Sequence, residues 1–158
     1  MNIGGVDPGV TGGLAMVGKS TETICMPMAT TCNGKDIVDG LAVANWFLHR
    51  HADVVVVEAA GARPGQGVVS MFRFGFVTGQ VVGALQAAGI GIYRVPPRVW
   101  KKHMGLLKQD KKQSLVRARE EFPENVDEFK RKTVDHGRAE AALMAVWYLD
   151  MKEGVQRA

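Results

Sequence analysis

The segment MNIGGVDPGVTGGLAMV, residues 1–17, gives the clearest indication of the fold. Its first half predicts a short strand over Met1–Val6 that leads into Asp7 and the turn-forming pair Pro-Gly. Its second half predicts a strand over Gly12–Val17, and a short connection links this to a third expected strand over Thr21–Met26. Short connections of this kind join antiparallel strands. The chain therefore opens on three antiparallel strands, with an acidic residue where the first strand ends.

Beyond residue 26 the pattern of apolar residues alternates between helical and strand periods. Apolar residues at helical spacing predict a helix over Asp36–His51, with Asp36 as its N-cap. The run DVVVV, Asp53–Val57, is typical of a strand buried on both faces, and it ends at Glu58. After a glycine-rich loop, the remaining expected elements are a helix over Val68–Ala88, a strand over Gly89–Val95, helices over Arg98–His103 and Lys111–Glu121, a loop over Pro123–Val134 and a helix over His136–Met151.

This order of elements predicts an α/β protein. Three antiparallel strands followed by parallel βαβ units form a mixed five-stranded sheet with helices on both faces. The length of 158 residues suits a single domain, residues 1–158, and the 46% hydrophobic and 23% charged content is ordinary for a soluble protein. The N-terminus lacks the features of a signal peptide, and no apolar run approaches the roughly 20 residues of a membrane span. We therefore expect a cytoplasmic protein with no membrane partner.

Cysteine usage and charge narrow the class further. Cys25 and Cys32, together with His49 and His51, do not have the number and spacing of a zinc site, so we expect free thiols in a reducing compartment. The net charge of +4 permits a polyanionic partner. Nine basic residues lie between Arg94 and Arg119, opposed there by a single aspartate. This segment is the strongest candidate for contact with nucleic acid.

Acidic residues stand at informative positions along the chain. Asp7 and Glu58 end strands that we expect to be parallel neighbours, and the carboxyl ends of such strands meet where α/β crevices form. Glu140 lies among alanines on the last helix, and Asp135 stands at the start of that helix. Two buried carboxylates about 4 Å apart repel by on the order of 4 kcal/mol, so a cluster requires counter-charge. Magnesium or manganese supplies it, and a pair of such ions catalyses phosphodiester hydrolysis.

Five blocks of sequence cover most of the chain, namely VDPGVTGGLAMV (6–17), VVVVEAAGARPGQGVVSMFRFGFVTGQVVGAL (54–85), VPPRVWKKHMGL (95–106), DKKQSLVRAREEFP (110–123) and DHGRAEAALMAVWYL (135–149). These blocks resemble those of RuvC-type Holliday-junction resolvases and occur in the order found in that family. The second block is closest to the phage and prophage branch. The resemblance implies a ribonuclease H-like fold, a homodimer, and cutting of four-way DNA junctions by paired nicks with two magnesium or manganese ions per site and no organic cofactor. It also implies a bacterial cell or a phage-infected bacterial cell as the setting.

The resemblance also implies a set of metal-binding residues. Many family members carry an acid or a histidine three residues before the final acid, and here that position is Gly137, which offers no ligand. We favour Asp135 as the replacement carboxylate and keep His136, which shares a helix face with Glu140, as a ligand or proton-transfer group. The candidate catalytic residues are Asp7, Glu58, Asp135, His136 and Glu140, and all except His136 are predicted metal ligands.

Three further features bear on DNA binding. The glycine-rich loop after Glu58 is expected to lie over the metal site, and Gly61 stands where some family members have an aromatic wedge. Lysines beside the crevice would contact phosphates and make affinity salt-dependent. The expected helix over Val68–Ala88 has more apolar surface than one core stripe needs, which indicates a symmetric dimer. The candidate DNA contacts are Arg63, Gln66, Arg73, Lys101, Lys102, Lys111 and Lys112.

Other functions remain open on the sequence alone. A related ribonuclease H-like nuclease acting on other branched DNA, flaps or RNA–DNA hybrids would use the same chemistry. A non-catalytic junction-binding protein would account for the basic segment but not for Asp7, Glu58 and Glu140. An actin-like or sugar-kinase-like phosphotransferase also opens with an aspartate and glycines before a hairpin, but such chains normally have two domains.

Overall fold

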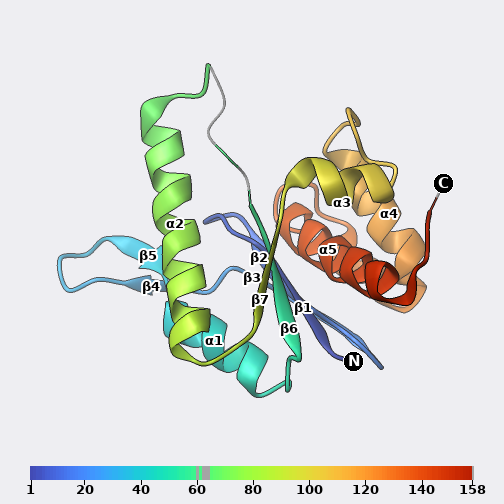
Figure 1. The fold of residues 1–158 in the computed structure, drawn as a ribbon. Helices are drawn as coiled ribbons and strands as arrows, with labels where there is room; N and C mark the ends of the chain where they lie inside the picture. Colours follow the sequence, from blue (N-terminus) through green and yellow to red (C-terminus); the bar gives the residue numbers. More distant parts are fainter. Residues whose placement is uncertain (60, 62–64, 158) are drawn as a thin grey trace.

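The computed structural model describes residues 1–59, 61 and 65–157. Its centre is a five-stranded sheet with the strand order β3-β2-β1-β6-β7 (Figure 1). β1 pairs antiparallel with β2 and β2 with β3, whereas β1 and β6, and β6 and β7, are parallel. The predicted α/β fold with a mixed five-stranded sheet is therefore confirmed. The strands are β1 (Ile3–Asp7), β2 (Gly13–Val17), β3 (Thr21–Cys25), β6 (Val54–Glu58) and β7 (Ile92–Val95).

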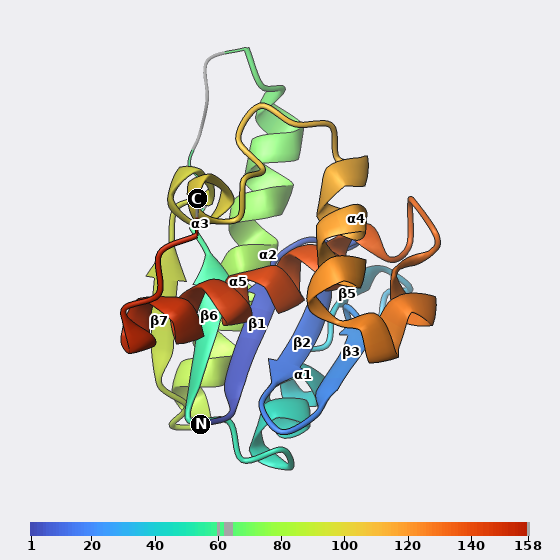
Figure 2. The same cartoon turned by 90° about the vertical axis from the view of Figure 1, so that its right-hand side faces the viewer.

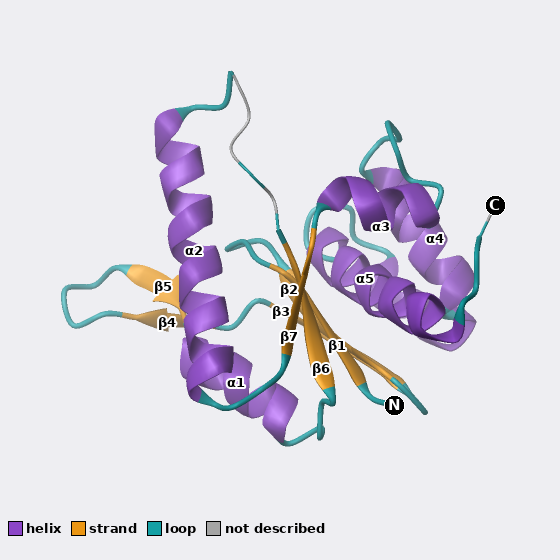
Figure 3. Ribbon diagram, viewed as in Figure 1, coloured by secondary structure: helices purple, strands orange, loops and turns teal. Residues whose placement is uncertain are grey.

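Helices cover both faces of the sheet (Figure 1 and Figure 3). On one side lie α3 (Pro97–His103), α4 (Lys112–Glu121) and α5 (His136–Glu153), and Figure 2 shows α5 crossing the strands; on the other lie α1 (Gly40–Leu48) and α2 (Val68–Ala87). Side chains alternate across a strand, so Val56 joins the apolar cluster under α5 while Val55 and Val57 join the cluster under α1 and α2. The β6 valine run is thus buried on both faces, as its sequence predicts.

Two glycines in β1 let the helices approach the sheet closely. A Cβ atom on Gly5 would lie 1.9 Å from the carbonyl oxygen of Ala141 in α5, and one on Gly4 would lie 2.6 Å from the Phe47 ring in α1. Larger residues at these positions would push both layers away from the sheet. The sequence IGGVD therefore fixes the distance between the end of β1 and α5, which is where the candidate site forms.

One predicted helix boundary is wrong. Residues 36–38 form β5 (Asp36–Val38), which pairs with β4 (Met28–Thr30) in a two-stranded hairpin. Asp36 caps no helix, because its side chain accepts a hydrogen bond from the Thr30 hydroxyl across the hairpin at 2.9 Å. Asp39 caps α1 instead, accepting from the Ala42 N–H at 2.9 Å. The second correction is smaller: part of the expected loop after residue 122 is a 3-10 helix, η1 (Pro123–Phe129).

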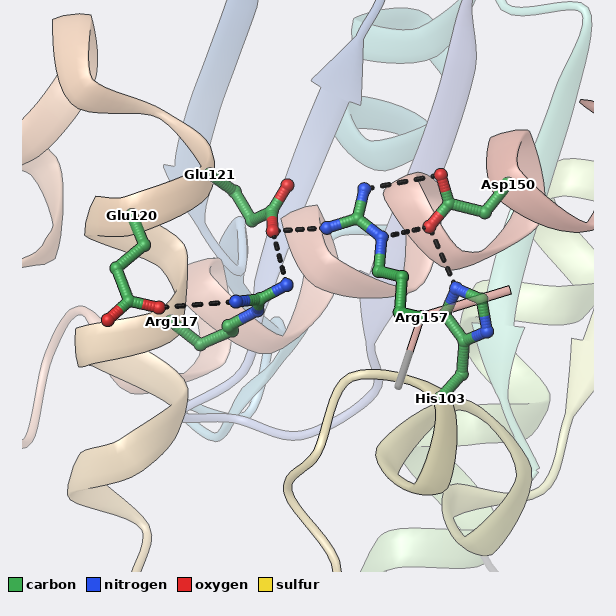
Figure 4. A network of polar contacts seen from close by, with 6 residues as sticks. All are labelled: His103, Arg117, Glu120, Glu121, Asp150 and Arg157. Atoms are coloured by element: carbon green, nitrogen blue, oxygen red, sulfur yellow. Dashed lines mark hydrogen bonds and ion pairs between the residues drawn. The ribbon is translucent and has the colours of Figure 1, made fainter. Parts of the chain in front are cut away.

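A charged network ties the three helices on one side of the sheet together (Figure 4). Arg157, near the C-terminus, contacts Asp150 of α5 and Glu121 of α4. His103 of α3 lies 2.8 Å from the same Asp150 carboxylate, and Arg117 lies 2.7 Å from Glu121. Because α3, α4 and α5 all carry residues of the candidate site described below, this network stabilises the scaffold of that site.

The helix α2 differs from the expectation that no apolar run approaches the length of a membrane span. By length and composition alone it is long and apolar enough to cross a membrane, although no such run was expected. The helix packs on the sheet through Val77, Val81 and Leu85. A helix with a core-facing stripe passes the same test, so this finding is weak evidence for a membrane span. It does show that much apolar surface of α2 is not used by the core.

Candidate active site

The carboxyl ends of β1 and β6 place Asp7 and Glu58 at the same edge of the sheet. Val6 is the parallel partner of Val57, so the next residue along each strand is one of the two acids. A pocket of about 470 Å³ opens at this edge. It is lined by Asp7, Thr11, Glu58, Lys101, Lys111, Lys132, Thr133, His136 and Glu140. Sequence positions from four separate segments therefore meet in one acidic pocket with a basic margin.

Asp7, His136 and Glu140 form a group of potential metal ligands in the pocket. One potential ligand atom from each lies within 4.8 Å of the others. His136 and Glu140 are four residues apart on α5 and so share a helix face. The start of α5 is pressed against the turn after β1, where Gly12 and Gly137 form a backbone bridge. A Cβ atom on Gly137 would lie 2.5 Å from the Gly12 carbonyl carbon, so a ligating side chain at position 137 would push α5 away.

Burial and neighbouring charges shift the pKa of Asp7. Loss of hydration together with the nearby carboxylates of Glu140 and Glu58 raises the pKa of Asp7 from 3.8 to about 7, against the opposing effect of His136 and Lys101. In the protein alone, Asp7 therefore holds a proton up to neutral pH. A divalent cation would remove this repulsion, so the charge balance of the pocket fits a bound metal ion.

The pKa of Glu140 is shifted in the opposite direction. Burial alone would raise its pKa, but hydrogen bonding and charge from His136 and Lys101 lower the pKa of Glu140 to about 2. Lys101 Nζ lies 2.7 Å from Glu140 Oε1, the Ser114 hydroxyl donates to the same oxygen at 3.0 Å, and His136 Nε2 lies 3.3 Å from it. Glu140 is thus ionised at every working pH, held in place by residues of α3, α4 and α5.

Glu58 is held by a different partner. Its side chain is buried, and the Trp100 indole N–H donates to Glu58 Oε2 at 2.9 Å. Glu58 lies outside the 4.8 Å group but lines the same pocket and contributes to the raised pKa of Asp7. The two strand-end acids therefore interact electrostatically across the pocket.

The expectation that Asp135 supplies a metal ligand does not fit the structure. Its side chain is fully buried, and both carboxylate oxygens have partners. The backbone N–H of Arg131 donates to Oδ2 at 2.7 Å, and the guanidinium groups of Arg131 and Arg138 lie 3.1 Å and 2.5 Å from Oδ1. Although burial opposes it, these contacts lower the pKa of Asp135. Asp135 therefore anchors the start of α5, whereas the next residue, His136, lines the pocket.

The candidate DNA-contacting residues differ in whether they line the acidic pocket or its neighbour. Lys101 and Lys111 line the acidic pocket, and Gln66 joins them in a neighbouring pocket of about 660 Å³ that also reaches Glu58. The side chains of Arg73, Lys102 and Lys112 are exposed but line neither pocket. Arg63 lies outside the described residues. Three pocket features were not expected from the sequence, namely the Ser114 and Trp100 hydrogen bonds to the acids and the position of Lys132.

A mixed sheet of this order, with an acidic pocket at the carboxyl ends of its central strands, is the ribonuclease H-like fold. No protein-family model matches the chain. The fold is similar to RuvC from Thermus thermophilus, with a TM-score of 0.64 and 19% identity over 96% of this chain and 97% of that one. RuvC from the same organism in complex with a Holliday junction substrate gives the same score and identity, with 96% of each chain covered. Within the ribonuclease H-like class, the chain therefore has the RuvC fold.

Two further proteins are similar to this chain. The yeast mitochondrial Holliday junction resolvase Ydc2 has a TM-score of 0.50 and 12% identity, over 96% of this chain and 80% of that one. In sequence, 94 residues, or 59% of the chain, are 35% identical to the chloroplastic Holliday junction resolvase MOC1 of Chlamydomonas reinhardtii. The matched region is 10% of that relative, so the chain aligns with only about a tenth of its length.

Proposed function

We propose that this chain is a metal-dependent endonuclease that resolves four-way DNA junctions by paired cuts. The observation that carries the proposal is the convergence of Asp7, His136 and Glu140 within 4.8 Å, with Glu58 in the same pocket. These residues come from both central strands and from α5, so no local turn or cap accounts for their meeting. The fold shared with RuvC, which has been solved with a Holliday junction substrate, supports the choice of substrate.

The donor set fits a divalent cation. Asp7, His136 and Glu140 would hold it, with Glu58 contributing from the neighbouring strand. When bound, the cation supplies an activated water and neutralises charge on the phosphate. Imidazole nitrogen suits transition metals, whereas magnesium sites are built from oxygen ligands. Because His136 is one of these ligands, we expect manganese to support DNA cleavage better than magnesium.

The protein's own groups prepare the site for an anionic substrate. Lys101 neutralises Glu140 from inside the pocket, and Lys111 stands at the pocket margin, where it is exposed. Three carboxylates and three lysines line one opening, so a phosphate can approach the acids beside compensating lysines. We propose that Lys111 contacts the DNA backbone, with Gln66 on the neighbouring wall. The exposed free thiols of Cys25 and Cys32 fit the reducing cytoplasm of a bacterial or phage-infected cell.

We further propose that the chain acts as a homodimer through α2. The outward face of this helix carries Phe72 and Phe76, which are 73% and 52% exposed and stack with ring centroids 6.4 Å apart. Gly75, Gly79 and Gly83 follow on the same face at four-residue spacing, and a Cβ atom at any of them would meet open space. Small residues at this spacing let two helix backbones approach closely, with the phenylalanines packing beside them. A two-fold dimer would present one pocket to each of two strands at a junction.

A cleavage panel tests the proposal. Synthetic four-way junction, matched duplex, flap and RNA–DNA hybrid are incubated with manganese, magnesium or EDTA. We expect paired nicks in the junction, dependent on metal, and little cutting of the duplex. Asp7→Asn and Glu58→Gln should abolish cutting while junction binding persists, with the exposed Asp127→Asn as the matched control. Preferred cutting of the hybrid or flap would indicate another nuclease, and metal-independent binding without cutting would indicate a binding protein.

A further inference from the structure

The chain leads from β7 directly into α3, and this places Trp100 next to Glu58, the acid at the end of β6. Val95 at the end of β7 is the register partner of Glu58, and the Ala59 N–H donates to the Val95 carbonyl at 2.8 Å. Pro96 and Pro97 then end the strand and begin α3, since proline fixes φ near the helical value and cannot donate to a sheet. One helical turn later, Trp100 lies over Glu58.

The contact between Trp100 and Glu58 is buried and directional. The Trp100 side chain is fully inaccessible and Glu58 is 7% exposed, and the indole N–H donates to Glu58 Oε2 at 2.9 Å. An indole N–H has a single donor direction, so the bond fixes the rotation of the carboxylate and with it the direction of the second oxygen. Away from water, a bond from a fixed donor to a charged acceptor is both strong and geometrically restrictive.

The next residue in α3 holds the other buried acid. Lys101 Nζ lies 2.7 Å from Glu140 Oε1 and 4.9 Å from the centre of the Trp100 ring. Consecutive residues of one short helix therefore contact Glu58 and Glu140, which reach the pocket from different elements. Displacing Trp100 would disturb Glu58 directly and remove the aromatic surface beside Lys101.

We propose that Trp100 is a positioning residue for the metal centre: its indole N–H sets the orientation of the Glu58 carboxylate towards the cation. The inference rests on the proposed function only through the existence of that centre. Partners of metal ligands typically change metal affinity by 10- to 100-fold when they are removed. A tryptophan that served only as core packing would alter folding stability but not metal affinity.

The test compares two matched tryptophan substitutions. Trp100→Phe removes the N–H and keeps an aromatic ring, and Trp147→Phe makes the same change at another buried tryptophan, on α5. Manganese binding to the DNA-free protein is measured by calorimetry, and the manganese concentration for half-maximal junction cleavage is measured separately. We expect Trp100→Phe to weaken both by about tenfold and saturating manganese to restore most of the cleavage rate. Trp147→Phe should leave both within about twofold.

Two outcomes would overturn the inference. The first is an unchanged manganese affinity in a folded Trp100→Phe variant, and the second is an equal loss in Trp147→Phe. If Trp100→Phe does not fold, the indole N–H resonances of the three tryptophans in the unmodified protein decide instead. Magnesium and Glu58→Gln should each shift the Trp100 resonance most, and a Trp100 resonance insensitive to both would contradict the proposal. If the protein binds manganese but cuts no junction, the substrate proposal fails while the affinity comparison still decides the role of Trp100.

Discussion

Replacing Asp7 by asparagine should stabilise the metal-free protein, and the gain should grow with pH. The pKa of Asp7 is raised from 3.8 to about 7, by burial first and then by Glu140 and Glu58. Well below pH 3.8 the carboxyl group is protonated in both the folded and unfolded states and costs no stability. As the pH rises towards 7 the unfolded state releases its proton while the folded state retains it, so stability is lost until folded Asp7 also ionises.

The size of this loss follows from the two pKa values. At about 1.4 kcal/mol for each pKa unit, the difference between 3.8 and about 7 corresponds to about 4 kcal/mol at pH 8. The same linkage gives about 1.5 kcal/mol at pH 5. Because Asp7 lies in a pocket open to solvent, screening makes these values upper limits. Asparagine has nearly the same shape and no charge, so the variant should recover most of that free energy.

Urea denaturation in EDTA at pH 5 and pH 8 measures the effect. We expect Asp7→Asn to raise the free energy of unfolding at both values, with a clearly larger gain at pH 8, while the exposed control Asp127→Asn changes it little. Manganese at 100 times its dissociation constant should add about 2.7 kcal/mol to the unmodified protein and much less to the variant. Equal stability of variant and unmodified protein at pH 8 without metal would show that burial and repulsion of the Asp7 carboxylate do not destabilise the pocket.

Three more predictions follow from the same structure. Because proton and metal compete for Asp7, the apparent manganese affinity should fall by up to about tenfold per pH unit below pH 7 and level off above it; calorimetry showing no change from pH 5.5 to 7 would contradict this. Gly79→Leu should turn a dimer into a folded monomer in light scattering, since its Cβ meets open space within one chain; a variant that remains dimeric would exclude this face. Arg157→Met should lower the free energy of unfolding by about 1.5–3 kcal/mol, because it leaves Asp150 and Glu121 without their shared guanidinium. An unchanged urea midpoint would show that the network adds no stability.

The fold and the two strand-end acids could be predicted from the sequence because local signals and topology agree there. The valine run before Glu58 required a doubly buried strand, and the short links between the first strands required antiparallel pairing. The β4–β5 hairpin was missed because Ile37 and the apolar residues of α1 share a helical spacing by chance. Asp36 and Asp39 both suit an N-cap, and only the pairing of Asp36 with Thr30 across the hairpin decides between them.

The interior of the site depended on contacts between distant residues. The sequence favours Asp135 over His136 as the additional ligand, but in the structure Arg131 and Arg138 already occupy the Asp135 carboxylate, and it is His136 that lines the pocket. The roles of Trp100 and Ser114 arise from the packing of α3 and α4 against the pocket, which a hydrophobic pattern does not encode. The close contact between Gly12 and Gly137 explains why a side-chain ligand is absent at the second of these positions.

An anomalous difference map from a crystal soaked in manganese shows whether the pocket of Asp7, His136 and Glu140 holds a metal ion. We expect a peak at ligand distance, about 2.0–2.6 Å, from carboxylate oxygens of Asp7 and Glu140, with the His136 ring and Glu58 adjoining it. A map with no ion in this pocket, or with manganese bound only elsewhere on the molecule, would contradict this expectation.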